Sequence, residues 1–200
     1  MAILIVLGAA ARAGAEWQFT PVVGYTFKGS TTLVDLENAA GTRHWNLGGA
    51  ITVIGDFPLG VEAHFVYTPG FFERVGTGTV GSLDVISSRT YALMGNAVIA
   101  MPRSWNRYGL RPFASGGLGL LHASAQDQLN LLPFRINLLG MNVGGGAVGF
   151  VSDRVGLRFD LRYFRNVQGP DIEDLDPPIS SGLPVRLRYW TASIGVVFRY

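Results

Sequence analysis

The sequence contains no cysteine and a single lysine among its 200 residues. The absence of cysteine excludes disulfide bonds, thiolate metal sites and a cysteine nucleophile. Charged residues make up 15% of the chain, against an ordinary value of about 25%, and the formal net charge is only +2. This composition excludes an intrinsically disordered chain, and without a long basic run it argues against nucleic-acid binding.

Long apolar runs are also missing, although 48% of the residues are hydrophobic and the mean hydropathy is +0.27. The longest run, residues 2–11, is too short for a membrane-spanning helix, which needs about 20 apolar residues. The small-residue pattern Ala11-Arg12-Ala13 follows it, so we expect residues 1–13 to be a signal peptide, truncated at its start. The alternative is a buried N-terminal strand or helix.

The apolar residues are instead distributed by alternation along the chain. In residues 155–163, for example, valine, leucine, phenylalanine and tyrosine occupy every odd position, and glycine, arginine and aspartate occupy the even ones. A period of two predicts β-strands with two unlike faces. Eight such segments are found, at about residues 16–27, 43–56, 61–69, 89–101, 109–123, 137–152, 155–166 and 186–200.

The connections between these segments alternate between long and short, which is typical of outer-membrane barrels. We therefore predict an all-β fold, an eight-stranded antiparallel up-and-down transmembrane β-barrel that occupies residues 14–200. The fifth and sixth segments are rich in glycine, and the pattern does not assign their inner faces.

Alternation alone fits two kinds of barrel, a soluble one with its apolar face around a ligand and a membrane one with that face toward lipid. Three features favour lipid, and the alternation of long and short connections is one of them. The opposite face carries small polar residues and few charges, and the apolar face has aromatic residues near the segment ends, as in a membrane-interface girdle. The predicted girdle consists of Trp17, Trp45, Tyr67, Tyr91, Tyr163 and Trp190.

The C-terminal residues Ser193, Gly195, Phe198 and Tyr200 match a polar-x-Gly-x-x-aromatic-x-aromatic pattern that is similar to the outer-membrane assembly signal. Together with residues 17–25 (WQFTPVVGY) and 111–119 (RPFASGGLG), it resembles the small OmpA-type outer-membrane β-barrel domain family. The resemblance implies residence in the bacterial outer membrane, insertion by the barrel assembly machinery, and lipid and lipopolysaccharide as partners. It implies no single shared activity, and we expect a monomer without a cofactor.

The predicted lumen of the barrel contains several charged groups. An unpaired charge there would cost several kcal/mol, so we expect Arg158 and Arg162 to pair with Glu62 and Asp160. Such a network forms either a plug that excludes water or a gate that can rearrange to pass solutes, and we favour the plug. The predicted lumen network consists of Glu62, His64, Arg111, Arg158, Asp160, Arg162 and Arg199.

His122 and Ser124 are weak candidates for a catalytic pair, because the same spacing is similar to lipid A deacylases. A serine nucleophile needs a base and a third, orienting group, and no glutamate occurs between Ser124 and Asp153. Acidic residues at 171, 173, 174 and 176 could bind a hard cation but lack the spacing of a calcium loop, so a solvated loop is preferred.

The leading prediction is therefore a structural or interaction protein of the outer membrane, with a plugged polar lumen and long extracellular loops. Two alternatives stay open. One is a narrow channel or lateral transporter for small apolar solutes, as in OmpW-type barrels, which an apolar outer half of the lumen would favour. The other is a lipid A-modifying esterase.

Overall fold

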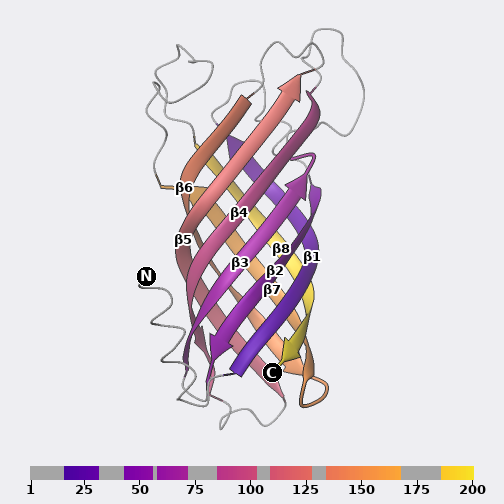
Figure 1. Cartoon of the computed structure of the whole chain (residues 1–200), viewed down its shortest axis with the longest axis vertical. Coiled ribbons are helices and arrows are strands. Elements are labelled where there is room, and N and C mark those ends of the chain that lie inside the picture. The colour runs from indigo at the N-terminus through magenta and orange to yellow at the C-terminus, as the bar shows by residue number, and fades with distance from the viewer. Residues whose placement is uncertain are drawn as a thin grey trace.

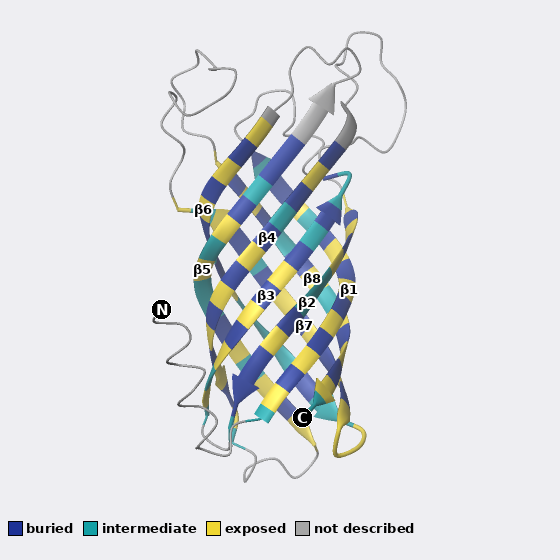
Figure 2. Cartoon of the chain, viewed as in Figure 1, coloured by how far each residue is buried: buried dark blue, intermediate teal, exposed yellow. Residues whose placement is uncertain are grey.

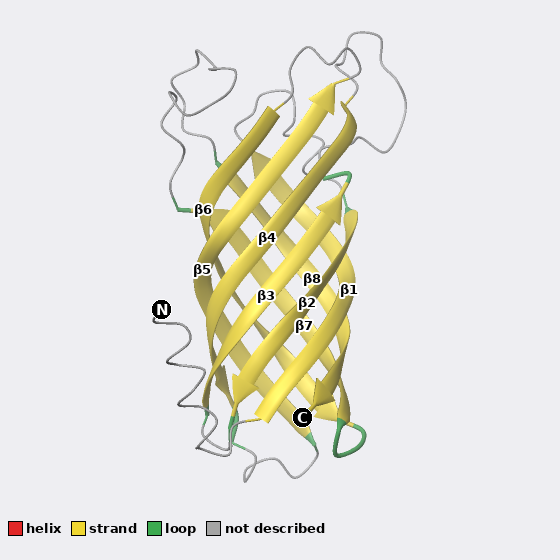
Figure 3. Ribbon diagram, viewed as in Figure 1, coloured by secondary structure: helices red, strands yellow, loops and turns green. Residues whose placement is uncertain are grey.

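The chain forms eight antiparallel strands that close into a barrel in the computed structural model (Figures 1 and 3). The structure describes residues 16–31, 43–55, 58–71, 85–102, 109–127, 134–167 and 186–200. The expected signal peptide and the acidic segment around residue 174 lie outside the described residues. The strands are β1 (Glu16–Thr31), β2 (His44–Ile54), β3 (Leu59–Pro69), β4 (Val85–Ala100), β5 (Leu110–Asp127), β6 (Phe134–Phe150), β7 (Val155–Asn166) and β8 (Leu187–Arg199).

Each strand pairs with the next one along the chain, and β8 pairs with β1 to close the barrel. At the seam, the Tyr200 backbone N–H donates to the Trp17 carbonyl at 2.9 Å, and the Trp17 N–H donates in return at 3.3 Å. Closure leaves no sheet edge with unpaired backbone groups. The predicted eight-stranded antiparallel up-and-down barrel is confirmed.

The connections define two rims of the barrel. One rim, here the turn rim, holds the start of β1, the end of β8 and the connections β2–β3, β4–β5 and β6–β7; the opposite rim is the loop rim (Figure 1). The predicted alternation of lengths is wrong at one place, because β5 and β6 extend beyond the expected segments and leave only residues 128–133 between them. Continued backbone pairing, from Ala123↔Ile136 to Ala125↔Phe134, accounts for this longer hairpin.

Burial alternates along every strand, as the checkered pattern of Figure 2 shows. On β7, Leu161 points outward and is 46% exposed, whereas its neighbour Arg162 points into the lumen and is 1% exposed. The same alternation assigns the glycine-rich strands that the sequence pattern left open. On β5 the inner face includes Ser115 and Leu121, and on β6 it includes Leu138 and Asn142.

Candidate functional site

A cluster of four charged side chains crosses the middle of the lumen. Glu62 projects from β3, and Arg158, Asp160 and Arg162 project from β7. Three strands lie between β3 and β7 in either direction around the barrel, so these groups come from opposite walls. All four are buried, and their formal charges sum to zero. We call them the ionic quartet.

Both arginines of the ionic quartet contact both carboxylates. Arg158 Nη2 lies 2.7 Å from Glu62 Oε2 and 2.7 Å from Asp160 Oδ2. Arg162 Nη2 lies 2.8 Å from Glu62 Oε1, and its Nε lies 2.7 Å from Asp160 Oδ1. Each charge has partners of opposite sign at hydrogen-bond distance. Their attraction offsets the free-energy cost of removing the four charges from water.

Neutral groups complete the surroundings of the quartet. Thr52 Oγ1 and Asn96 Nδ2 donate to Glu62 at 3.1 and 3.0 Å. These two residues are the direct cross-strand partners of Glu62, so the β2–β3–β4 register places them there. The alternation of residues does not single out Thr52 and Asn96, although the short β2–β3 turn sets the register that places Thr52 opposite Glu62. Gly144 lies opposite Arg162, where a Cβ atom would stand only 2.7 Å from Arg162 Cγ.

Two of the other predicted lumen residues, Arg111 and Arg199, lie away from the quartet, whereas His64 lies two positions from Glu62 on the same face of β3. His64 is buried on the loop-rim side, and neither ring nitrogen has a hydrogen-bond partner among the described residues. Arg111 is buried near the turn rim, where its Nε donates to the Met101 carbonyl at 2.8 Å. Arg199 lies at the turn rim itself, 3.8 Å from Glu16 and over the Phe150 ring, so it is not part of the central network.

Apolar side chains fill the lumen on the loop-rim side of the quartet, which sequence analysis did not predict. Phe71, Tyr189 and Phe164 form a chain of ring contacts with centroids 5.2 and 5.1 Å apart. The signal was hidden because both faces of these strands are apolar at this level. The cluster consists of Val66, Phe71, Ala92, Met94, Leu121, Ala123, Ile136, Leu138, Phe164, Leu187 and Tyr189.

A second, smaller apolar cluster closes the lumen on the turn-rim side. It consists of Ile54, Val98 and Ala100, with Phe113 packed against it. The Phe113 ring also lies 4.3 Å from the Arg158 guanidinium carbon, which links this cluster to the quartet. A cavity of about 20 Å³ remains between the two, which is room for about one water molecule. Side chains of the ionic quartet and of the two apolar clusters therefore occupy the lumen at three successive levels.

The six aromatic residues that the sequence predicts as a girdle lie on the outer wall. Trp45, Tyr67, Tyr91, Tyr163 and Trp190 lie toward the loop rim, and Trp17 lies at the turn rim. Their rings meet across strands, with Tyr67 and Tyr91 centroids 4.9 Å apart and Tyr163 and Trp190 centroids 5.2 Å apart. Apolar side chains, among them Phe65 and Phe159, occupy the wall between the two levels.

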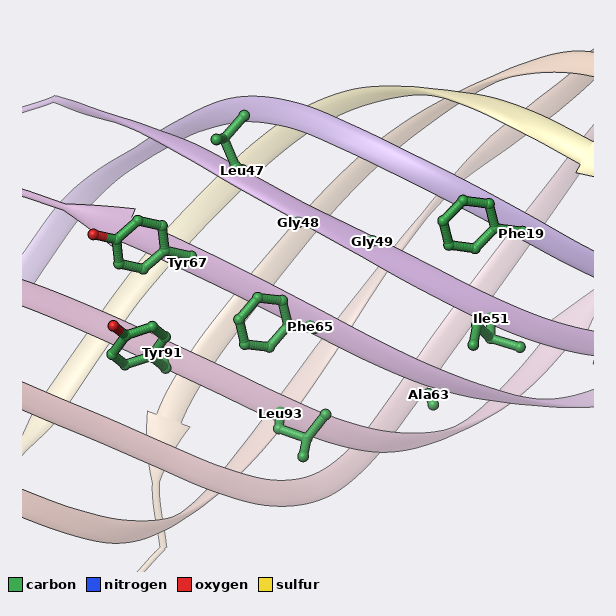
Figure 4. Close-up of a pocket in the computed structure, with 10 residues that line it drawn as sticks. All are labelled: Phe19, Leu47, Gly48, Gly49, Ile51, Ala63, Phe65, Tyr67, Tyr91 and Leu93. Carbon is green, nitrogen blue, oxygen red and sulfur yellow. The ribbon is translucent and has the colours of Figure 1, made fainter.

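A shallow apolar hollow interrupts this wall over β2, β3 and β4 (Figure 4). Its volume is about 650 Å³, and small residues on β2 and β3 make its floor. The lining faces outward, so the hollow belongs to the outer surface and not to the lumen. The lining residues are Phe19, Leu47, Gly48, Gly49, Ile51, Ala63, Phe65, Tyr67, Tyr91 and Leu93.

His122 and Ser124 share the outer face of β5 but have different partners. His122 Nδ1 lies 2.7 Å from the side-chain oxygen of Asn137, and Ser124 Oγ accepts from Arg89 Nε at 3.3 Å. No hydrogen bond joins His122 to Ser124 in the described part of the chain. No group of three or more metal-ligating side chains occurs among the described residues.

The C-terminal assembly pattern lies on β8 at the closure of the barrel. Gly195 faces the lumen wall beside Val22 of β1, whereas Phe198 faces outward and pairs with Phe19. Tyr200 is 85% exposed at the turn rim. Ser193, Gly195 and Phe198 therefore belong to the strand that closes the barrel, and Tyr200 follows its last residue.

Comparison with solved structures identifies the fold. Neisserial surface protein A (NspA) matches with a TM-score of 0.61 and 15% identity, over 94% of this chain and 99% of that one. The chain has the fold of the small outer-membrane β-barrels. OprG from Pseudomonas aeruginosa matches at 0.60 and 10% identity, over 94% and 97%. A major outer membrane protein from Thermus thermophilus matches at 0.54 and 13% identity, over 93% and 99%.

No protein-family model and no curated protein matches the sequence. The likeness to small outer-membrane barrels is therefore one of fold, and it confirms the resemblance that the sequence motifs predict at that level. Within the described part of the chain, no helix is long and apolar enough to cross a membrane.

Proposed function

We propose that the protein is an integral component of the bacterial outer membrane whose barrel is closed by its own side chains and which acts through its surfaces. The ionic quartet carries this proposal, because Arg158 and Arg162 reach from β7 to Glu62 on the opposite wall. A barrel of eight strands has an interior just wide enough for side chains, so a bridge across it obstructs the passage.

The outer surface supports the membrane location. On β1 the outward apolar residues run from Trp17 to Phe27, ten residues apart. At about 3.3 Å per residue and a tilt of about 40°, this spans about 25 Å, the height of the apolar band of outer-membrane barrels. In a cell, we expect the protein in outer-membrane fractions, with the folded form migrating differently from a boiled sample on a denaturing gel.

Planar-bilayer conductance tests the closed lumen. The wild-type protein should give no steps above the baseline. Arg158→Ala with Arg162→Ala removes the side chains that bridge the lumen. Steps are expected when Phe71→Ala and Phe113→Ala are added, because these two side chains belong to the apolar clusters on either side of the quartet. Arg165→Ala on the outer face of the same strand should stay silent, and steps from the wild type would contradict the proposal.

The apolar cluster on the loop-rim side of the lumen supports a second candidate, a transporter for small apolar solutes. Phe71 is fully buried there and contacts Tyr189, so its removal would leave an apolar space. We expect Phe71→Ala to increase the binding of an apolar fluorescent probe, with Phe71→Leu as the conservative control. If neither the wild type nor Phe71→Ala binds the probe, this candidate is rejected.

We infer that the protein is not an esterase, because His122 and Ser124 engage an amide and a guanidinium instead of one another. Mass spectrometry of lipid A from cells with and without the protein should show the same acyl chains. Loss of an acyl chain that depends on Ser124 would overturn this inference.

Folding into the membrane implies a further partner, the barrel assembly machinery. The pattern formed by Ser193, Gly195, Phe198 and Tyr200 supports this proposal. Phe198→Ala with deletion of Tyr200 should lower the amount of folded barrel in outer membranes, whereas spontaneous folding into detergent should change little.

A further inference from the structure

Basic side chains gather on the outer face of the barrel at the loop rim. Among the side chains that the structure describes, this face carries seven cations and no acidic group, whereas the turn rim carries Glu16 and Asp153 beside Arg154 and Arg199. The set, which we call the cationic collar, consists of Lys28, Arg43, Arg89, Arg135, Arg165, Arg186 and Arg188.

Two arginines of the collar stand directly opposite one another. Arg165 on β7 is the cross-strand partner of Arg188 on β8, and both side chains are exposed. Like charges in this position destabilise a sheet. Neither has an acidic partner among the described side chains, so an external anion would relieve their repulsion.

The backbone adds a third cation beside this pair. Arg188 pairs on its other side with Ser30, and the β1–β8 register shifts between Phe27 and Ser30. Lys28 lies in this bulge with a φ of 50°, a left-handed conformation that costs a residue with a side chain about 1 kcal/mol or more. The bulge turns Lys28 outward, where an unbroken alternation would have pointed it into the lumen.

A second row of cations lies on the other side of the barrel. Arg89, Ser124 and Arg135 are successive cross-strand partners on β4, β5 and β6. The two arginines are thus two strands apart, about 10 Å, with a hydroxyl between them. Ser124 itself is buried, and its Oγ accepts from Arg89 Nε. Guanidinium groups bind phosphate oxygens through paired hydrogen bonds.

The depth of both rows matches the headgroup region of a membrane. Tyr163 and Trp190 lie two residues below Arg165 and Arg188 on the same face, and Tyr91 lies two residues below Arg89. Tyrosine and tryptophan concentrate at the membrane–water interface. The collar therefore lies about 5 Å farther out, given the rise of a tilted strand, at the level of lipid phosphates.

We propose that the cationic collar binds the phosphate groups of lipopolysaccharide in the outer leaflet. The inference rests on the proposed function, which puts the loop rim in that leaflet. Charge complementarity supports it, since Arg165 and Arg188 stand opposite one another without an acidic partner among the described side chains, and lipid A carries phosphates. The apolar hollow of Figure 4 begins at Tyr91 and Leu93, directly below Arg89 along β4. An acyl chain of the same lipid would pack against this apolar surface.

Lipid-dependent stability tests the proposal, because a ligand that binds only the folded state raises the temperature of unfolding. The full chain is folded into phosphatidylcholine vesicles with and without bisphosphorylated lipid A, and unfolding is followed by heat-modifiable migration. Lipid A should raise the transition temperature of the wild type, and added salt should reduce the shift. Arg165→Gln with Arg188→Gln should lose most of the shift, and so should Arg89→Gln with Arg135→Gln.

Arg154→Gln is the matched control, because it removes one exposed arginine from the turn rim. It should keep the full shift, whereas Arg188→Gln alone should weaken the apparent affinity for lipid A by about tenfold. Equal shifts in the wild type and both double variants would overturn the proposal.

Two further arms identify the source of the phosphate. Dephosphorylated lipid A should give no shift. Soluble polyphosphate added to phosphatidylcholine vesicles should give a smaller shift than lipid A, and an equal one would overturn the assignment to a lipid. If the chain folds in phosphatidylcholine vesicles but lipid A does not shift its transition temperature, only the proposed lipopolysaccharide site is rejected. If the chain folds in no vesicle, the proposed function is rejected.

Discussion

The outward and inward faces of β7 place apolar and charged side chains in opposite environments. Outward, Leu157 and Leu161 are exposed on the outer surface at mid-height of the barrel. Inward, Arg158 and Arg162 are buried at the same level. In a soluble protein the positions would be exchanged. The difference shows that a charged side chain can be buried where groups of opposite charge contact it. Burial alone does not exclude a charge.

The comparison has an energetic consequence. The quartet is stable because its four formal charges balance and every carboxylate has partners. The loss of one member leaves a buried charge without compensation, which lowers the free energy of unfolding. The outer face has no such cooperativity, because each aliphatic side chain meets hydrocarbon independently. Substitutions should therefore have unequal effects on the two faces.

The largest effect is expected from Arg162→Ala. The change leaves Glu62 and Asp160 with one arginine between them, so the lumen holds an uncompensated negative charge. Breaking a buried ion pair in this way costs about 3–5 kcal/mol of the free energy of unfolding. Urea titration of the barrel in vesicles, followed by heat-modifiable migration, measures it.

Arg165→Ala is the control for this prediction, because the residue lies three positions farther along the same strand and is exposed. Its loss should change the free energy of unfolding in plain phosphatidylcholine by less than about 0.5 kcal/mol. Similar costs for the two substitutions would break the comparison between the faces.

A somewhat smaller loss is expected when a charge is placed on the wrong face. Leu161→Arg puts a guanidinium at mid-height of the lipid-facing wall, where it costs about 2–4 kcal/mol. Val155→Arg, on the same face but at the turn rim, should cost about 0–1 kcal/mol because water and headgroups are near. The same urea titration applies, and an equal cost at both depths would show that this wall does not face hydrocarbon.

A double-mutant cycle sharpens the account of the inner face. Glu62→Gln and Arg162→Gln each unbalance the quartet, but together they restore neutrality. We expect a coupling free energy of about 1–3 kcal/mol, with the double variant more stable than the sum of the single changes predicts. Additive costs would mean that the two groups do not stabilise one another in the lumen.

The sequence predicts the outer face better than the inner one. Hydrocarbon imposes the same requirement along every strand, so Leu157, Phe159 and Leu161 alternate without interruption, and the strand count and closure follow. The charged positions 62, 158, 160 and 162 are also visible, because charges are rare on membrane strands. Only the registers across β2, β3 and β4 add Thr52 and Asn96 to them.

The apolar half of the lumen could not be read in the same way. Val66 and Met94 face inward between outward residues that are also apolar, so the period of two disappears there. The extent of the β5–β6 hairpin was hidden for a related reason. Backbone hydrogen bonds carry the pairing beyond the rim, where side-chain polarity no longer distinguishes a strand from a loop.

The smallest effect is expected on the outer wall near the loop rim, at the level where we expect the boundary between hydrocarbon and water. Tyr163→Leu keeps an apolar side chain on the wall but removes the ring contact with Trp190. Such a contact contributes about 0.5–1.5 kcal/mol beyond buried area, so the free energy of unfolding should fall by that amount. Tyr163→Phe, which keeps the ring, should retain most of it. If the phenylalanine variant is as unstable as the leucine one, the hydroxyl at the interface stabilises this position and the ring contact does not.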